Sequence, residues 1–256
     1  MLFDSHAHYN DKQFDSDRDE LLSSMKKNGV GMIMNAADSI KSVEKVLEIA
    51  EKYPFVYASV GVHPENVGNM TDGDLGYLEE ISAHEKVKAI GEFGLDYYYD
   101  DVERDVQKYW FGQQLELAEK LNLPVIIHDR DAHADCMEIL KRFDMKKMGG
   151  VIHCYSGSDQ MAKELVSMGM YLGFGGVVTF KNAKKVRKAL EVVPMENILI
   201  ETDCPYLAPE PHRGERNNSI LMHFTAEKIA EIKGVTKEEV EMQSYKNALK
   251  LYNIKE

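Results

Sequence analysis

The sequence has few cysteines, and they form no recognisable pair. Its three cysteines, Cys136, Cys154 and Cys204, include no Cys-x-x-Cys spacing. An odd number of cysteines argues against a disulfide framework, and a chain without one is typical of a reducing compartment. We therefore expect a cytoplasmic protein.

Long apolar runs are also missing. The chain opens with Met1-Leu2-Phe3-Asp4, which places an acid where a signal peptide needs a basic stretch and then an apolar run. No window approaches the about 18 uninterrupted apolar residues of a membrane-spanning helix. The sequence therefore predicts no membrane partner, and nothing in it indicates an obligate protein partner.

Positive charge is in short supply. The 256 residues carry 43 acidic and 31 basic side chains, a net charge of −12. This balance excludes a histone-like protein that binds nucleic acid with its whole surface. The charge balance does not exclude a local phosphate-binding site, because bound divalent metals can make the local electrostatic potential positive. With 44% hydrophobic residues, 18 glycines and 7 prolines, the chain can bury a core and is not of low complexity.

Short apolar runs alternate with longer amphipathic stretches along the whole chain. Eight runs have the composition of buried parallel strands, and they cover residues 2–3, 31–35, 55–60, 87–90, 124–127, 150–152, 170–173 and 198–200. Helical spacing or capping predicts helices over 17–28, 43–52, 106–121, 134–143, 161–168, 183–192 and 236–252.

This alternation predicts the α/β class and, more narrowly, a single-domain (β/α)8 TIM barrel over residues 1–256 with an extra C-terminal helix. Eight units in 256 residues fit the typical barrel length of about 250 residues. An open doubly wound sheet is the alternative, but no Gly-x-Gly-x-x-Gly follows the first strand.

Residues that can bind metal or phosphate follow six of the eight predicted strands. The carboxyl ends of barrel strands meet at one mouth, where active sites are built, so we expect these side chains to lie close together. They are His6 and His8 after the first strand, His63 after the third, Glu92 after the fourth, His128 and Arg130 after the fifth, His153 after the sixth and Asp203 after the eighth.

Taken alone, each of these residues has a simpler interpretation. A single histidine such as His128 or His153 is often a hydrogen-bonded structural residue, and an acid such as Glu92 can cap a helix. Five of the nine histidines, however, lie just after predicted strands. Residues two apart on a strand face the same way, so His6 and His8 can bind one ion.

Several acids and imidazoles buried together are costly unless a cation satisfies them, and a pair of divalent ions does so. Glu92, central in strand order, is the expected bridge between ions roughly 3.5–4 Å apart. A water between such ions can have a pKa of about 7 and attack phosphorus or a carbonyl, and Asp203 would take its proton. The mixed donor set does not choose among Mg, Mn and Zn.

Seven motifs occur in the order of one enzyme family. They are Asp4-Ser5-His6-Ala7-His8, Gly61-Val62-His63-Pro64, Gly91-Glu92-Phe93-Gly94-Leu95-Asp96-Tyr97, His128-Asp129-Arg130, His153-Cys154-Tyr155-Ser156-Gly157, Gly176-Val177-Val178-Thr179-Phe180-Lys181 and Glu201-Thr202-Asp203-Cys204-Pro205-Tyr206-Leu207. This ordered set resembles the TatD-like metal-dependent deoxyribonucleases, which belong to the amidohydrolase-like metal-dependent hydrolases. The resemblance runs from residue 4 to about residue 217.

The resemblance implies a barrel with two divalent ions and hydrolysis of phosphodiester bonds in DNA, often from a 3′ end. It implies one ion surrounded by His6, His8, Glu92 and Asp203, and another surrounded by Glu92, His128 and His153. Two substrate-binding candidates, His63 and Arg130, match positions that face the substrate phosphate. The others are Tyr155 in the motif after the sixth strand, Lys181 in the densest basic run, and Arg213, which opens the Arg-Gly loop of the family.

Some features leave substrate preference open. Gly175 stands where the family commonly has Ser, and Asn218-Ser219 stands where an acid or polar residue and then Pro are usual. Tyr97, Tyr98 and Tyr99 either stack on an unpaired base or pack beneath a loop.

Two other functions also stay open. The same site could hydrolyse another ester, of the aminoacyl-tRNA or lactone type, or the barrel could be a metal-dependent binding protein. The acidic balance favours short contacts at a strand end over the wrapping of a long duplex. We therefore expect modest DNA affinity with weak sequence preference.

Overall fold

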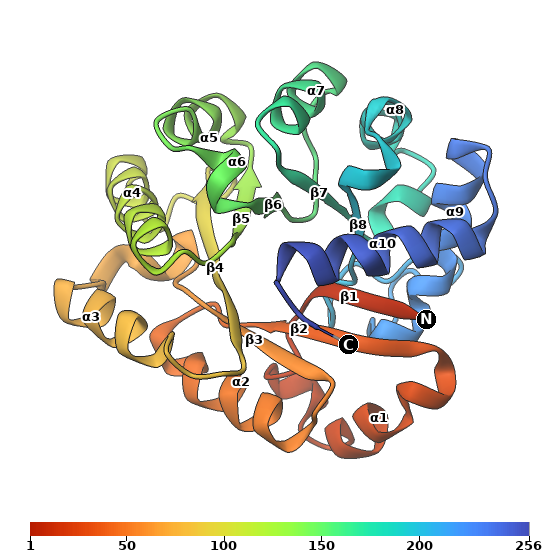
Figure 1. Ribbon diagram of the computed structural model, residues 1–256, viewed down its shortest axis with the longest axis horizontal. Helices are drawn as coiled ribbons and strands as arrows, with labels where there is room; N and C mark the ends of the chain where they lie inside the picture. Colours follow the sequence, from red (N-terminus) through yellow and green to blue (C-terminus); the bar gives the residue numbers. More distant parts are fainter. Residues whose placement is uncertain (256) are drawn as a thin grey trace.

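Eight parallel strands follow one another around a barrel in the computed structural model, which describes residues 1–255 (Figure 1). Each strand pairs with the next one along the chain. The strands are β1 (Leu2–Ala7), β2 (Val30–Ala36), β3 (Val56–Val60), β4 (Val87–Asp96), β5 (Val125–Arg130), β6 (Gly150–Ile152), β7 (Tyr171–Phe174) and β8 (Ile198–Ile200). The predicted TIM barrel is confirmed.

Helices fill the connections between strands and surround the sheet (Figure 1). They are α1 (Arg18–Ser24), α2 (Ile40–Lys52), α3 (Asp72–Ile81), α4 (Arg104–Leu121), α5 (His133–Leu140), α6 (Met145–Met148), α7 (Asp159–Ser167), α8 (Lys184–Val192), α9 (Met222–Lys233) and α10 (Lys237–Leu251). Short 3-10 helices are η1 (Lys12–Phe14), η2 (Lys26–Asn28), η3 (Pro64–Asn69), η4 (Gly176–Thr179), η5 (Met195–Asn197) and η6 (Ser219–Leu221). Over residues 1–255, no helix combines the length and apolar character needed to cross a membrane.

The first and last strands meet through hydrogen bonds that continue past the end of β8. The Ser5 hydroxyl donates to the Ile200 carbonyl at 3.0 Å. The Asp203 backbone N–H donates to the His6 carbonyl at 3.0 Å, and the His8 N–H donates to the Cys204 carbonyl at 2.9 Å. The barrel is nearly closed by these bonds, which bring the first and last motifs of the chain together.

Apolar side chains form two packed layers. Inside the barrel, residues such as Phe3, Ile126 and Leu199 pack against the C-terminal helix α10. The ring centre of Phe3 lies 6.1 Å from that of Tyr245 and 5.8 Å from that of Tyr252. A larger cluster lies between the sheet and the outer helices. The predicted extra helix therefore covers the barrel interior at the end where β1 begins (Figure 1).

The predicted elements differ from the observed ones in a few places. β1 and β4 extend beyond their apolar runs and include the polar motifs that follow them. The helix predicted over 17–28 is observed as α1, which ends at Ser24, followed by η2. Gly29, with φ of +82°, ends η2 and turns the chain into β2. The helix predicted over 134–143 is observed as α5, which ends at Leu140, and α3, α6 and α9 were not predicted.

Candidate metal centre

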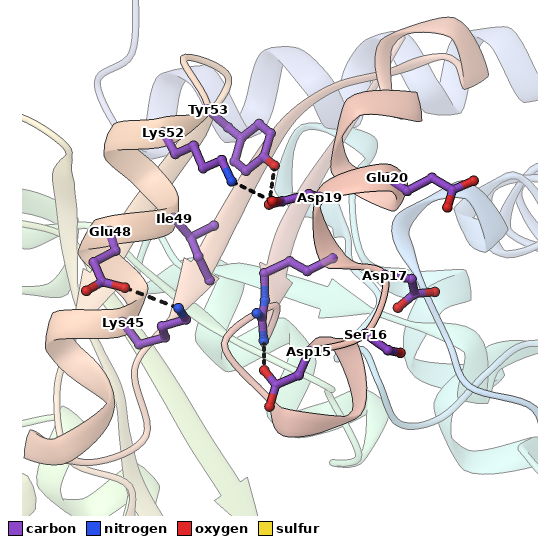
Figure 2. A pocket seen from close by; sticks show the side chains of 11 residues that line it. Asp15, Ser16, Asp17, Asp19, Glu20, Lys45, Glu48, Ile49, Lys52 and Tyr53 are labelled. Atoms are coloured by element: carbon purple, nitrogen blue, oxygen red, sulfur yellow. Dashed lines mark hydrogen bonds and ion pairs between the residues drawn. The ribbon is translucent and has the colours of Figure 1, made fainter.

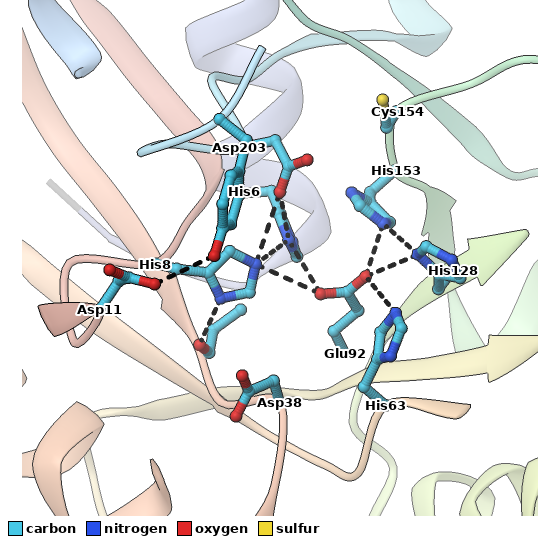
Figure 3. Close-up of polar contacts among 12 residues, drawn as sticks. His6, His8, Asp11, Asp38, His63, Glu92, His128, His153, Cys154 and Asp203 are labelled. Carbon is cyan, nitrogen blue, oxygen red and sulfur yellow. Dashed lines mark hydrogen bonds and ion pairs between the residues drawn. The ribbon is translucent and has the colours of Figure 1, made fainter. Parts of the chain in front are cut away.

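The two strands that carry His6 and Glu92 depart from regular pairing at these residues. The register of β1 against β2 shifts within residues 4–7, and that of β4 against β5 shifts within residues 90–93. Irregularities of this kind re-aim side chains beside active sites. Both side chains meet at the barrel mouth, where Glu92 lies between two sets of histidines (Figure 3).

One carboxylate oxygen of Glu92 faces the first ligand group, which consists of His6, His8 and Asp203. Glu92 Oε2 lies 3.2 Å from His6 Nε2 and 3.3 Å from His8 Nε2. Asp203 Oδ1 lies 3.6 Å and 3.5 Å from the same two nitrogens. Asp203 takes a left-handed backbone conformation with φ of +56°, which turns the chain just after β8.

The other oxygen of Glu92 faces the second ligand group, which consists of His128 and His153. Glu92 Oε1 lies 2.9 Å from His128 Nδ1 and 2.7 Å from His153 Nε2. His63 Nε2 lies 3.7 Å from the same oxygen. The close pairing of Gly94 with His128 brings β4 and β5 together here, since a Cβ at Gly94 would overlap the His128 carbonyl.

The donor atoms fit divalent cations. His6 Nε2 lies 3.0 Å from His8 Nε2, and His128 Nδ1 lies 3.1 Å from His153 Nε2. Two imidazole lone pairs at such distances repel unless a proton or a cation lies between them. The donor atoms of His6, His8 and Asp203 all lie within 4.8 Å of one another, as do those of His6, Glu92 and His153, so either set is close enough to share an ion.

Partners behind two of the histidines orient their rings. His8 Nδ1 lies 3.0 Å from the Ala36 carbonyl, and His128 Nε2 lies 2.9 Å from Asp96 Oδ2. An acceptor at one ring nitrogen holds the proton there, so the other nitrogen turns its lone pair toward the site. This arrangement is typical of metal-binding histidines.

Without a bound metal ion, the histidines of the site have very different pKa values. Burial lowers the pKa of His6 to about 4 and that of His63 to about 3. Burial also disfavours the charged form of His128, but hydrogen bonds with Asp96 and Glu92 outweigh it and raise its pKa to about 10. At neutral pH, His128 therefore carries a proton that a metal ion must displace.

The two candidate carboxylate ligands stay ionised. Burial raises the pKa of Glu92, but the charges of His153 and His6 outweigh it and hold this pKa well below its usual value. Burial likewise opposes ionisation of Asp203, whose pKa is lowered by a hydrogen bond with His8 and by the charge of His153. Both acids are available as anionic ligands, and Asp203 can accept a proton.

Asp4 ties the segment after β8 to β1 beneath the first ligand group. Its fully buried carboxylate accepts hydrogen bonds from the Thr202 N–H at 3.0 Å, the Thr202 hydroxyl at 2.7 Å and the Ser219 hydroxyl at 2.6 Å. Asp4 lies two residues before His6, and Thr202 lies one residue before Asp203. The network therefore sets the spacing between two candidate ligands.

Sequence reasoning assigned no role to the three buried acids Asp4, Asp96 and Glu201. They are at most 1% exposed, and each contacts a candidate ligand or its neighbour. All three lie inside the quoted motifs at spacings of two or four from a predicted ligand. An acid at such a spacing within an apolar run is the sequence feature that could have identified them.

The predicted substrate-binding residues have different surroundings. His63 lies against the second ligand group, with its ring centre 4.3 Å from that of His128. Tyr155 is buried, and its hydroxyl donates to the Ser158 carbonyl at 2.6 Å. Its hydroxyl is therefore engaged within its own loop.

The three predicted cationic residues are more exposed. Lys181 is exposed just beyond η4, and the exposed Arg213 guanidinium lies 4.3 Å from the ring centre of Phe180. Arg130 Nη1 lies 4.0 Å from Asp96 Oδ2, which also contacts His128. Of the three, Arg130 is therefore the one that these contacts tie to the candidate ligands.

A surface pocket away from the mouth is lined by charged residues between residues 15–20 and α2 (Figure 2). Its side chains largely satisfy one another: Asp15 pairs with Arg18, Asp19 with Lys52, and Glu48 with Lys45. The pocket therefore presents no converging set of free polar groups comparable to the mouth.

Comparison with known proteins gives the same family along the whole chain. The family model for TatD-related DNases matches residues 3–253. The chain is 45% identical over 254 residues to YabD of Bacillus subtilis, an uncharacterized metal-dependent hydrolase, and the match covers 99% of this chain and 100% of that protein. It is 33% identical to a 3′-5′ ssDNA/RNA exonuclease TatD of Cronobacter sakazakii, with 98% and 97% covered.

A solved structure agrees with these matches. The crystal structure of YJJV, a TatD homolog from Escherichia coli K12, superposes with a TM-score of 0.93 at 31% identity and covers 99% of this chain and 98% of that one. The resemblance predicted from the ordered motifs is confirmed. The chain therefore belongs to the TatD-related DNase family and is a metal-dependent hydrolase of ester bonds.

Proposed function

We propose that this hydrolase cleaves phosphodiester bonds at DNA ends with two divalent ions, Mg, Mn or Zn. One ion would be held by the first ligand group and Glu92, and the other by the second ligand group and Glu92. The observation that carries the proposal is the position of Glu92, whose two oxygens face separate sets of imidazole nitrogens at 2.7–3.3 Å. A single carboxylate so placed can bridge two ions.

The bound ions would supply Lewis-acid stabilisation of the phosphoryl oxygens and a water of lowered pKa. The protein contributes the placement of these ions and a proton acceptor. Asp203 is the acceptor that we propose, because it is anionic and its side chain is 17% exposed, whereas that of Glu92 is 4% exposed. Asp203 therefore faces the mouth, from which substrate enters.

Substrate phosphate would be held beside the second ligand group. His63 follows β3 and lies against Glu92, and Arg130 ends β5 and lies near Asp96. Lys181 and Arg213 would contact phosphates further from the scissile bond. Tyr155 would shape its loop through its bond to Ser158, because its hydroxyl is already engaged.

The net charge of −12 supports a small footprint on nucleic acid. A protein that tracks a long duplex neutralises many phosphates and needs an extended basic groove. The relative from Cronobacter sakazakii named an exonuclease of ssDNA and RNA supports action on a single strand. We therefore propose a nucleic-acid end, with few bases contacted, as the substrate.

The test is cleavage of an end-labelled single-stranded DNA by wild type and Asp203→Asn, with bound metal measured on the same samples. We expect Asp203→Asn to lose about 10²- to 10⁴-fold in turnover, the usual contribution of a general base, while most of the metal stays bound. Metal-free wild type should be inactive. Full cleavage after removal of all metal by a chelator would refute the proposal.

The same preparations should be assayed with an aminoacyl ester and a lactone. Faster turnover of either ester than of DNA would assign the site to another ester bond, since bound ions would polarise a carbonyl as well as a phosphoryl group. The metal requirement would be unchanged in that case, so the substrate comparison separates the two functions.

A further inference from the structure

Three consecutive tyrosines follow β4, and the structure divides them into two kinds. Tyr97 is held in place, because its hydroxyl donates to Asp135 Oδ2 at 2.6 Å and the Arg104 guanidinium lies 4.2 Å from its ring centre. Tyr98 and Tyr99 are 58% and 44% exposed. Only the second and third tyrosines therefore expose their rings at the surface.

Asp96 links these two tyrosines to the candidate metal centre. Its Oδ1 accepts hydrogen bonds from the Tyr98 N–H at 2.9 Å and the Tyr99 N–H at 3.4 Å. Its Oδ2 lies 2.9 Å from His128 Nε2, and the opposite nitrogen of that ring faces Glu92. The backbone of the aromatic pair is therefore tied through Asp96 to a member of the second ligand group.

The Arg130 guanidinium lies over the same pair. Its guanidinium carbon is 3.9 Å from the ring centre of Tyr98 and 5.2 Å from that of Tyr99. Among residues 1–255, no carboxylate other than that of Asp96, at 4.0 Å, forms an ion pair with this guanidinium, and no hydrogen bond occupies it. Its N–H groups are therefore available to a phosphate.

We propose that Tyr98, Tyr99 and Arg130 form a nucleotide subsite, in which an unpaired base stacks on the tyrosines and Arg130 binds the adjoining phosphate. This inference rests on the proposed function and names the part of the substrate that lies beyond the metal centre. Stacking on an aromatic ring does not depend on the base sequence, because every base has a π-face. An unpaired base can swing onto the rings, whereas a base inside a duplex is already stacked on both sides.

The residues around the subsite are mostly acidic, which favours recognition by base stacking rather than by contacts with a row of phosphates. Asp100 and Asp101 follow the tyrosines directly, and Glu65 lies near enough to Arg130 to feel its charge. One cation among these acids can hold a single phosphate but cannot guide a long backbone. Binding should therefore depend on the presence of a base more than on the number of phosphates.

The experiment compares an intact single-stranded oligonucleotide with one that is abasic at its terminal nucleotides. Binding is measured by fluorescence anisotropy with a chelator present, so that cleavage does not interfere. Wild type should bind the intact strand about 5- to 150-fold more tightly for each base that stacks. The double variant Tyr98→Ala/Tyr99→Ala should bind the two strands equally.

Tyr109→Ala is the matched control, since Tyr109 is 54% exposed on the outer helix α4. This variant should behave as wild type.

A terminal 2-aminopurine gives a second readout, because its fluorescence is quenched when it stacks. Quenching should persist in Tyr109→Ala and disappear in the double variant. Arg130→Lys should weaken binding of intact and abasic strands alike, because a lysine keeps the charge but not the planar fork.

Cleavage of the intact strand by wild type with Mn²⁺ tests the proposed function separately. If wild type cleaves DNA but the double variant keeps the full preference for a base, the subsite is refuted and the nuclease stands. If wild type prefers the base without cleaving, the subsite stands and the nuclease is refuted. Absence of both cleavage and preference refutes both.

Discussion

Glu201 occupies space inside the barrel that Gly173 leaves open on β7. A Cβ at Gly173 would overlap the Glu201 carboxylate. Glu201 Oε1 accepts a hydrogen bond from the Cys154 N–H at 2.5 Å and lies 3.8 Å from His153 Nδ1. Within residues 1–255, His153 Nδ1 and Glu201 Oε2 are buried without a hydrogen-bond partner. The glycine thus admits the acid that holds the segment bearing His153.

Gly173→Ala should therefore weaken metal binding by displacing Glu201. We expect an overpacking cost of about 1–3 kcal/mol in the free energy of unfolding. Metal affinity should fall by about 10–100-fold, the usual effect of disturbing a partner behind a ligand. Chelator competition and denaturant unfolding measure the two quantities.

Gly112→Ala provides the control for this substitution. Gly112 lies in α4, and no atom comes within 4 Å of its added Cβ. This change should leave metal affinity unaltered and raise the free energy of unfolding by about 0.5–1 kcal/mol. Equal metal affinity in the two alanine variants would contradict the role given to Gly173.

Glu92→Gln should reduce the metal bound at both ligand groups together, because an amide has only one acceptor oxygen and no charge. We expect metal affinity to fall by about 100-fold or more. This loss exceeds the 10- to 100-fold that is typical when a residue hydrogen-bonded to a metal ligand is changed. Elemental analysis after gel filtration measures the metal retained per chain. Glu48→Gln is the control, since that acid lies in the surface pocket away from the mouth and pairs with Lys45. Retention of full metal content by Glu92→Gln would contradict the bridging role.

Metal binding should release protons. The pKa of His128 in the protein alone is raised to about 10, so its ring is protonated at pH 7 and must lose that proton to become a ligand. Apparent metal affinity should therefore rise as the pH is raised toward 10 and fall as the pH is lowered. Calorimetry at pH 7 in buffers of different ionisation enthalpy counts the protons. His128→Asn should release about one proton fewer, and an unchanged count would contradict this assignment.

Thr236→Ala should destabilise the barrel without touching the metal centre. The Thr236 hydroxyl accepts from the Glu239 N–H at 3.2 Å, and Glu239 Oε2 accepts from the Thr236 N–H at 2.8 Å. Loss of this cap of α10 should lower the free energy of unfolding by about 1 kcal/mol, measured with urea. Metal content should match wild type, and a loss of metal would show that α10 affects the centre.

Several features were accessible from the sequence because they depend on local pattern. Eight apolar runs alternating with amphipathic stretches sufficed to predict the barrel. The histidines and acids that follow those runs were predicted to meet at its mouth, and they lie together there in the structure. The capping box at Thr236 located α10. α3 was missed because it contains Gly73 and Gly76 and buries one residue, Leu78. α9 was missed because its buried face mixes polar and small residues with apolar ones.

Other features were decided by the tertiary structure alone. The register shifts around His6 and Glu92, the fit of Glu201 against Gly173 and the difference between Tyr97 and its two neighbours have no local signature. Each depends on contacts between strands or loops that are distant in the chain. A sequence pattern specifies which way a side chain faces on a regular strand, but irregular pairing and the space left by a neighbouring strand determine what it touches.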